Sequence, residues 1–157
     1  MDKVHIDVRE MTIDDLSGVY HMGEQLFTLK DFPNLYRTWD EYGVVALFQS
    51  EPEFSLVADI EGELAGFALG YIIEKPRVPW NYGHLVWLGV DKKFQRFGVA
   101  SKLLNEFREK MVSKNVRIML IDTQADNEGA IKFFKKHGFS DPRAHVYMTL
   151  NLNEAKT

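Results

Sequence analysis

A basic turn that contains a glycine separates an apolar run from an amphipathic run, and it is the clearest candidate for chemistry in the chain. It spans residues 91–101, with the sequence DKKFQRFGVAS. Helix starts ordinarily favour acidic residues, because their N–H groups are unpaired and carry the positive end of the helix dipole. This start carries two lysines and Arg96 instead, and Gly98 and Ala100 leave room for a ligand beside the backbone. The turn therefore predicts a phosphate-binding site, and a solvated turn without a ligand is the alternative.

Composition excludes several other kinds of site. The chain has no cysteine, which excludes disulfides, thiolate metal sites and a cysteine nucleophile. Its five histidines are scattered, so no protein-held metal is expected. A formal net charge of -4 argues against nucleic acid and favours a small molecule or peptide as partner. No signal peptide and no apolar window of about 18 residues is found, so we expect a cytoplasmic protein with no membrane partner.

Hydrophobic periodicity predicts the elements that must position this turn. Strands are predicted over 4–9, over two runs within 53–74 that are joined at 61–63, and over 84–90, 116–122 and 144–152. Helices are predicted over 11–27, 37–49, 98–114 and 127–139. No linker or repeat interrupts this order, so residues 1–157 are expected to form one mixed α/β domain with helices covering its sheet.

The turn and its surroundings resemble a known family. Residues 95–100 read Q-x-x-G-x-A, which resembles the [QR]-x-x-G-x-[GA] pyrophosphate-binding motif of the GNAT superfamily of N-acetyltransferases. The run NEGAIKFFKKHGF resembles the second signature of that family, and VREMTIDDLSGV resembles its usual opening. The resemblance covers essentially the whole chain. It implies a GNAT fold, with helices on both faces of a mostly antiparallel sheet and a splayed parallel pair formed by the strands at 84–90 and 116–121.

The resemblance also implies acetyl-CoA as the acyl donor and a primary amine as the acceptor, on a protein N-terminus, a lysine side chain, a polyamine or a small amine. Backbone groups of Leu88, Gly89 and Val90 would pair with the pantetheine arm, with the Val90 N–H near the thioester carbonyl. The pyrophosphate would lie on the turn and helix start, namely Gln95, Arg96, Phe97, Gly98, Val99, Ala100 and Ser101. Without cysteine, direct transfer in a ternary complex is expected.

The second signature supplies further site residues by the same resemblance. Asn127 would hydrogen-bond the cofactor arm, while Phe133 and Phe134 would line it. In the family a tyrosine usually protonates the leaving thiolate from the position of Phe134, which has no hydroxyl to donate. The candidates for this role are Tyr147, Tyr82 and His145, or water. Phe134 also leaves open a catalytically weak or inactive module that binds CoA.

His84 is the candidate general base. Alkylamines have a pKa of about 10, as lysine does, so a base must remove a proton before attack. Several family members carry a glutamate six residues before the valine that ends the strand, and this chain has His84 there. Neutral imidazole is available at pH 7, and an even step along a regular strand places His84 on the same side as Val90. A strand-end histidine that only hydrogen-bonds locally is the alternative.

The resemblance implies an acceptor pocket formed by the last strand pair and by the segment between the first two helices, residues 27–42. Aromatic residues there would form a wall and acidic residues would attract a cation: Phe27, Phe32, Tyr36 and Trp39, with Asp31, Asp40 and Glu41. A solvated acidic loop above core aromatics is the alternative. Dimers are common in the family, so a homodimer is a further expected partner.

Overall fold

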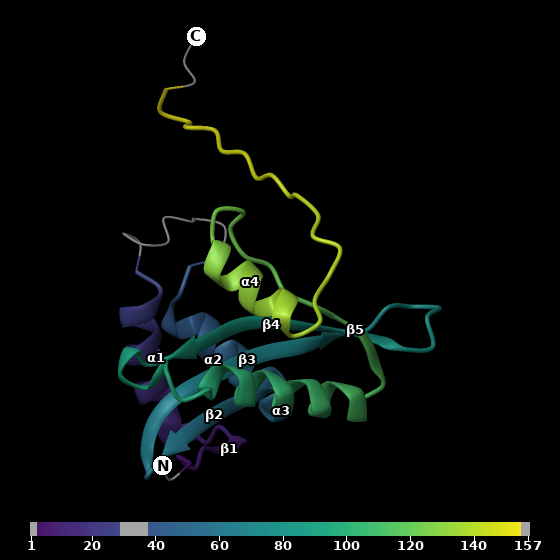
Figure 1. Cartoon of the computed structure of the whole chain (residues 1–157). Helices are drawn as coiled ribbons and strands as arrows, with labels where there is room; N and C mark the ends of the chain where they lie inside the picture. Colours follow the sequence, from purple (N-terminus) through teal and green to yellow (C-terminus); the bar gives the residue numbers. More distant parts are fainter. Residues whose placement is uncertain (1–2, 29–37, 155–157) are drawn as a thin grey trace. The chain divides into compact units, whose positions relative to one another are not determined.

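The computed structural model describes residues 3–28 and 38–154 (Figure 1). It consists of two compact units, Met1–Asp122 and Thr123–Thr157. The strands are β1 (Asp7–Glu10), β2 (Ser55–Ile60), β3 (Glu63–Ile73), β4 (Asn81–Val90) and β5 (Val116–Leu120). The helices are α1 (Leu16–Leu26), α2 (Glu41–Ser50), α3 (Val99–Ser113) and α4 (Glu128–Lys136), with short 3₁₀ turns η1 (Ile13–Asp15), η2 (Pro52–Phe54) and η3 (Lys92–Phe94).

The first unit is built on a five-stranded sheet in the order β1-β2-β3-β4-β5. The first three pairings are antiparallel and the last, β4 with β5, is parallel. The predicted hairpin between β2 and β3 is present, and its turn residues Glu61 and Gly62 have φ of 52° and 79°. Two residues at positive φ make the tight turn that joins twisted antiparallel strands. The predicted mixed, mostly antiparallel sheet is thus confirmed.

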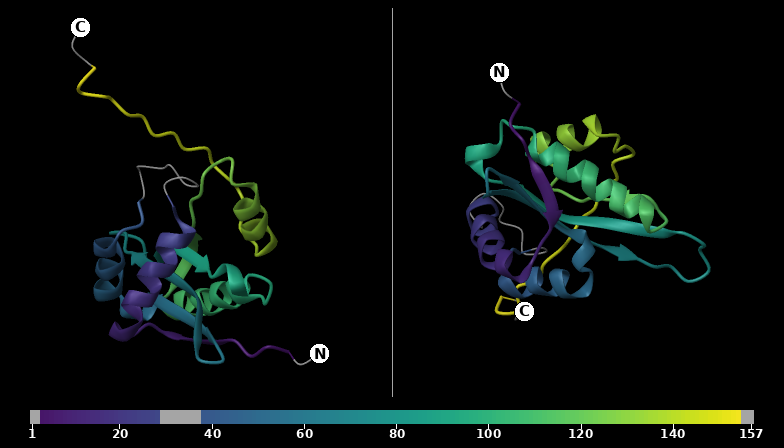
Figure 2. Two further views of the ribbon diagram at one scale, coloured as in Figure 1. Left: turned by 90° about the vertical axis from the view of Figure 1, so that its left-hand side faces the viewer. Right: turned by 90° about the horizontal axis from the view of Figure 1, so that it is seen from below.

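Helices cover both faces of this sheet: α1 and α2 lie on one face and α3 on the other (Figure 2). The core under α1 and α2 consists of buried residues from both helices, the sheet and the segment after β1, namely Met11, Val19, Met22, Val44, Val57, Phe67 and Leu69. Half-buried aromatic side chains close this core, including Phe27, Trp39 and Trp87. The amphipathic pattern of α1 therefore places its apolar side on the sheet, as predicted.

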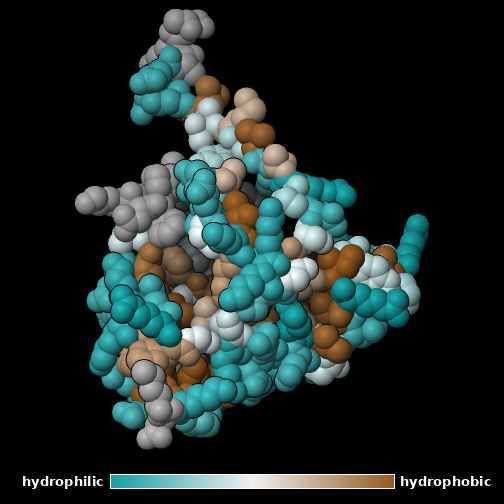
Figure 3. Space-filling view, viewed as in Figure 1, coloured by the Kyte–Doolittle hydropathy of each residue, from teal (hydrophilic) through white to brown (hydrophobic). Residues whose placement is uncertain are grey.

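On the opposite face, α3 buries the apolar stripe that its sequence predicts: Val99, Leu103, Leu104, Phe107 and Met111. Glycines in β3 let the helix approach closely. A Cβ at Gly70 would collide with the carbonyl oxygen of His84 and lie 2.6 Å from Phe107. The solvent side of α3 carries Lys102, Arg108 and Glu109, and the surface there is predominantly hydrophilic (Figure 3).

A β-bulge in β4 changes which side chains share a face. Leu69 pairs with Trp87 but Gly70 pairs with Leu85, so Val86 is an extra residue in β4. His84 therefore lies opposite Tyr71, on the face covered by α1 and α2. Val90 lies opposite Gly66, whose Cβ would point at Val99 and Leu103 of α3. The expectation that His84 and Val90 share a face is thus wrong, because the extra residue inverts the alternation.

The second unit contains α4 and the residues after it. Gly138, with φ of 96°, follows the C-cap His137 and ends the helix where the sequence predicts. The strand predicted over 144–152 is absent, and residues 139–150 carry no regular structure. The alternating side chains Val146, Met148 and Leu150 are 80%, 91% and 72% exposed. Alternation of apolar and polar residues alone does not make a strand, because a strand also needs a hydrogen-bonded neighbour.

Candidate active site

The two parallel strands separate part-way along β4. Residues Asn81–His84 pair with Val116–Leu120 of β5. Among the described residues, Leu85 and Trp87–Val90 pair with β3 alone. The Asp91 N–H donates to Ala65 O of β3 at 2.8 Å, so by alternation the N–H and C=O groups of Leu88 and Val90 point away from β3. We call this edge of β4 the open side.

The turn that follows β4 is fixed to the strand by its own side chains. Asp91 Oδ1 accepts a hydrogen bond from the Lys93 N–H at 2.9 Å and begins η3. Gln95, the first residue of the sequence motif, donates from Nε2 to Val90 O at 3.2 Å. Phe94 is buried beneath the turn. Gln95 therefore joins the turn to the end of the strand.

The N-cap residue of helix α3 is Gly98, which has φ of 80° and no side chain to cap the helix. The first turn contains no acidic residue, and a Cβ at Gly98 would meet nothing within 4 Å. The Lys102 N–H donates to Gly98 O at 3.1 Å, so the N–H groups of Val99 and Ala100 precede the intrahelical hydrogen bonds. The positive end of the helix is thus approachable beside a residue with no side chain.

The basic side chains of the turn differ in their surroundings. Lys93 Nζ forms an ion pair with Glu63 Oε1 at 2.9 Å, which joins the turn to the β2–β3 hairpin. Arg96 and Phe97 are exposed beside Gly98. Arg96 is therefore better placed than Lys93 to meet an anion at the helix start.

His84 lies in a hydrogen-bonded chain of three side chains. Its Nδ1 is 3.1 Å from the Tyr71 hydroxyl and its Nε2 is 2.9 Å from Asp122 Oδ1. The rings of Tyr71 and His84 meet edge to face at 5.3 Å. The side chain of His84 is 21% exposed and that of Asp122 is 46% exposed. An imidazole and a phenol in contact can pass a proton between them, and a carboxylate on the other imidazole nitrogen can stabilise the charge that results.

Sequence reasoning missed two members of this chain. Tyr71 meets His84 through antiparallel pairing of β3 with β4, and Asp122 follows β5, in which Leu120 pairs with His84. Both contacts depend on strand register, and the bulge in β4 shifts that register. An aspartate directly after a strand expected to run parallel to the His84 strand is the one signal in the sequence that points to Asp122.

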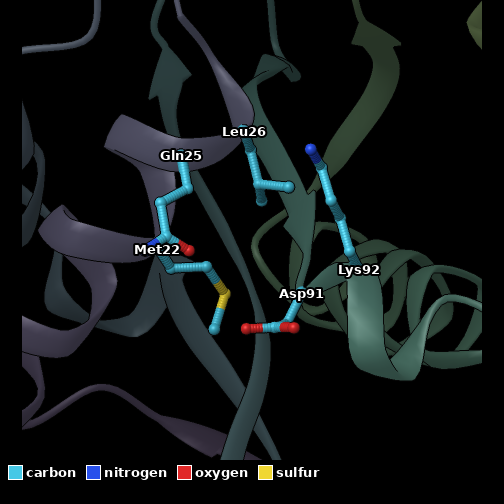
Figure 4. A pocket seen from close by; sticks show the side chains of 5 residues that line it. All are labelled: Met22, Gln25, Leu26, Asp91 and Lys92. Atoms are coloured by element: carbon cyan, nitrogen blue, oxygen red, sulfur yellow. The ribbon is translucent and has the colours of Figure 1, made fainter.

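A small pocket lies at the end of β4 beside α1. Met22 and Gln25 project from α1 toward Asp91, and Leu26 and Lys92 complete the lining (Figure 4). Its volume is about 240 Å³. Sites for small ligands usually occupy about 300–1,000 Å³, so this pocket is too small for a whole cosubstrate.

The comparison with known proteins decides the family. A model described as the acetyltransferase (GNAT) family matches residues 23–139. The chain belongs to this family. The predicted N-acetyltransferase class and GNAT fold are therefore confirmed, and the match includes β4, the turn, α3 and α4.

This GNAT protein is similar in sequence to a curated relative and in fold to solved structures. The N-alpha-acetyltransferase of Sulfolobus acidocaldarius is 22% identical, over 92% of this chain and 87% of the relative. The solved structure of Ard1 from Thermoplasma volcanium has a TM-score of 0.74 at 24% identity, covering 89% of this chain and 86% of that one. Arabidopsis thaliana Naa50 in complex with the bisubstrate analogue CoA-Ac-MVNAL has a TM-score of 0.73 at 24% identity, with the same coverage.

The GNAT site residues expected in the second unit have the following local contacts. Asn127 caps α4, since its Oδ1 accepts from the Ala130 N–H at 3.2 Å. The ring of Phe134 packs on Phe133 at 5.2 Å and on Phe139 at 5.3 Å. Tyr147 is 51% exposed in the segment after α4. The roles of these residues toward a cofactor stay predictions.

The acceptor wall expected for this GNAT protein falls partly outside the described residues, namely at Asp31, Phe32 and Tyr36. Phe27 and Trp39 pack with Trp87 at ring distances of 4.8 and 5.1 Å from it, as part of the core. Asp40 accepts a hydrogen bond from the Gly43 N–H at 2.7 Å and caps α2. These contacts match the alternative expectation of core aromatics beneath a loop.

The structure adds two observations on other classes of site. In residues 3–28 and 38–154, no three His, Asp or Glu side chains gather as metal ligands would. Within the same ranges, no helix has the length and apolar character needed to cross a bilayer.

Proposed function

We propose that this GNAT protein transfers an acetyl group from acetyl-CoA to a primary amine in a ternary complex. The observation that supports it most is the open side of β4, which leads directly into the glycine-started helix α3. An extended amide chain pairs with a strand edge through backbone groups alone. A pyrophosphate at the far end of that chain would meet the helix N-terminus.

The residues of the first unit fit acetyl-CoA in two respects. The backbone groups of Leu88 and Val90 point to the open side and would pair with the amides of the pantetheine arm. The pyrophosphate would accept from the N–H groups at the start of α3, with Arg96 adding charge. Its negative charge would then occupy the place that acidic residues take in ordinary helix starts.

The N–H that polarises the thioester carbonyl must lie near the base. Residues in a strand advance by about 3.3 Å, and because Val86 is bulged the separations are counted on β3, where the partners of Leu88 and Val90 lie three and five residues from the partner of His84. Leu88 is therefore about 10 Å along the sheet from His84 and Val90 about 17 Å. The Leu88 N–H is therefore better placed than the Val90 N–H to stabilise the oxyanion. Val90 then contributes backbone pairing to the arm rather than the oxyanion contact that the sequence suggested.

His84 is the proposed base for the acceptor amine. It is held between Tyr71 and Asp122 and is largely shielded from solvent. Removal of a positioned base typically costs 10²–10⁴-fold, so His84→Ala should lower kcat/KM by roughly 10²-fold. Steady-state rates with a good amine substrate measure this, and an unchanged kcat/KM would remove His84 from the mechanism.

A peptide N-terminus is the acceptor to test first. The Sulfolobus acidocaldarius relative is named for N-alpha acetylation, and the ligand of the Naa50 structure joins CoA to a peptide sequence. Lysine side chains, polyamines and small amines complete the panel. Mass spectrometry of each amine after incubation with acetyl-CoA would identify the acetylated class.

A binding module without turnover is the second candidate, and Phe134 favours it because it cannot donate a proton to the leaving thiolate. Thiols such as that of cysteine have a pKa of about 8.5, so a thiolate leaves at neutral pH with little help from an acid. Phe134 is thus compatible with catalysis. Acetyl-CoA binding measured by calorimetry, together with no acetylated product from any amine, would establish the binding module instead.

Tyr147 stays a candidate acid for the thiolate. If it donates that proton, Tyr147→Phe should lower kcat modestly, because the thiolate is already a fair leaving group. Single-turnover rates with acetyl-CoA would show the change. An unaltered rate removes Tyr147 and leaves solvent as the donor.

A further inference from the structure

The hydrogen bonds of His84 determine which of its nitrogens is basic. A carboxylate only accepts hydrogen bonds, so the proton of neutral His84 lies on Nε2, which faces Asp122 at 2.9 Å. Nδ1 is then the acceptor, and the Tyr71 hydroxyl donates to it at 3.1 Å. The basic nitrogen is thus covered by a phenol.

We propose that Tyr71 is a catalytic residue that takes the proton of the acceptor amine and passes its own to His84, and that Asp122 is the positioning residue that keeps Nδ1 basic. This inference rests on the proposed N-acetyl transfer. In this relay the atom that accepts the proton of the amine, directly or through one water, is Tyr71 Oη rather than a nitrogen of the His84 ring.

The proton transfers balance as follows. The acceptor arrives as an ammonium, and one of its protons moves to Tyr71 Oη while the Tyr71 hydroxyl proton moves to His84 Nδ1. Tyr71 stays neutral, His84 becomes an imidazolium and the amine is left with a free lone pair. The amine nitrogen then attacks the thioester carbonyl carbon, so that a C–N bond forms and the C–S bond breaks, and the second proton of the nitrogen goes to the departing CoA thiolate or to water. Loss of the first proton from His84 to water restores the neutral imidazole.

Asp122 acts on this step in two ways. Its carboxylate fixes the tautomer, and its negative charge stabilises the imidazolium that forms on His84. It is 46% exposed, so water screens part of this interaction. Asp122→Asn keeps the size of the side chain but offers an amide that can donate to Nε2, which favours the opposite tautomer.

Two variants separate a relay from a passive contact. If Tyr71 only covers Nδ1, then Tyr71→Phe frees that nitrogen and the rate is unchanged or rises. If Tyr71 relays the proton, Tyr71→Phe lowers kcat by roughly 10²-fold and leaves the KM for acetyl-CoA unchanged. Asp122→Asn is expected to lower kcat in the same way and to alter the acidic limb of the pH profile.

Matched control substitutions show whether a loss of kcat is specific to the relay or follows from any similar substitution elsewhere in the protein. Tyr20→Phe changes a tyrosine of α1 that lies outside this hydrogen-bonded chain, and Asp7→Asn changes an exposed aspartate of β1 at the other edge of the sheet. Both should keep wild-type kcat. Nitrogen-15 NMR of the His84 ring gives a readout independent of turnover, with the proton expected on Nε2 in the wild-type protein and shifted toward Nδ1 in Asp122→Asn.

The outcomes distinguish the relay from the proposed function. Turnover that depends on His84 but survives Tyr71→Phe overturns the relay alone, as does a wild-type His84 protonated on Nδ1. Absence of turnover in the wild-type protein with every amine overturns the N-acetyl transfer and with it the catalytic role of Tyr71. Loss of kcat in both variants, with normal controls and an Nε2 proton, supports the relay.

Discussion

At the scale of one residue, Gly98 is the residue on which the proposed phosphate site most depends. Its φ of 80° lies in the left-handed region, where a side chain is strained, although nothing lies within 4 Å of a Cβ there. Gly98→Ala should therefore cost about 1–2 kcal/mol of folding free energy and turn the N–H groups at the start of α3. We expect the KM for acetyl-CoA to rise by about 10-fold, which corresponds to about 1.4 kcal/mol of binding.

Gly62 provides the matched control for this substitution. It has φ of 79° and equally open surroundings, but it lies in the β2–β3 hairpin. Gly62→Ala should lower the unfolding free energy by a similar amount and leave the KM for acetyl-CoA unchanged. Thermal melts and steady-state kinetics on both variants test this, and equal KM values for the two would contradict a phosphate site at α3.

The positions predicted correctly are those that depend on near neighbours in sequence. Gly98 lies at the start of α3, as the flanking sequence pattern indicates, while its role toward a phosphate stays a prediction. Tyr71 and Asp122 were missed because they reach His84 across strands, through a register that the sequence does not specify. The same reason explains the wrong expectation for the faces of His84 and Val90.

At the scale of the elements, the contact of α3 with the sheet depends on a glycine in β3. Gly70→Ala would place a methyl group against the His84 carbonyl and Phe107. We expect a loss of about 2–3 kcal/mol in unfolding free energy, because the packed surfaces must move apart. Gly43→Ala, in the exposed first turn of α2, should instead add about 0.5–1 kcal/mol. Urea unfolding that ranks these two variants in the opposite order would contradict the packing described.

An ion-pair cluster joins β1, β2 and the start of α1. Arg9 donates to Asp15 at 2.7 and 2.9 Å and to Asp59 at 2.9 Å. The hydrogen bond from Arg9 lowers the pKa of Asp15 to about 2 from its ordinary value of 3.8, despite partial burial, and hydrogen bonds from Thr12 add to the shift. Because the pKa is lowered on folding, the stabilisation is complete above about pH 4 and is lost as the pH falls toward 2.

Asp15→Asn tests this cluster. At pH 7 we expect a loss of about 1 kcal/mol in unfolding free energy, less than the full pKa difference implies because Arg9 is partly exposed to solvent. The difference from the wild-type protein should shrink between pH 4 and pH 2, as the wild-type carboxylate becomes protonated. Asp14→Asn, at the exposed neighbouring position, should show no such pH dependence in chemical denaturation.

The element order was largely predictable, since hydrophobic periodicity fixes type and approximate position. The exceptions have physical causes. Alternation over 144–152 predicts a strand, but pairing is a property of two segments and no ladder forms there in the structure. The bulge at Val86 is likewise a property of the β3–β4 pair, so the sequence of β4 alone reads as a regular strand.

At the scale of the whole molecule, the central claim is acetyl transfer from acetyl-CoA to an amine. The most direct test is thiol release from acetyl-CoA, because the protein has no cysteine and every thiol detected by a reactive dye belongs to CoA. We would compare one peptide with a free N-terminus and the same peptide with a blocked N-terminus, alongside polyamines and lysine-containing peptides. The account predicts thiol release that requires a free amine and falls in His84→Ala. Retained acetyl-CoA binding with no amine-dependent release from any member of the panel would contradict it.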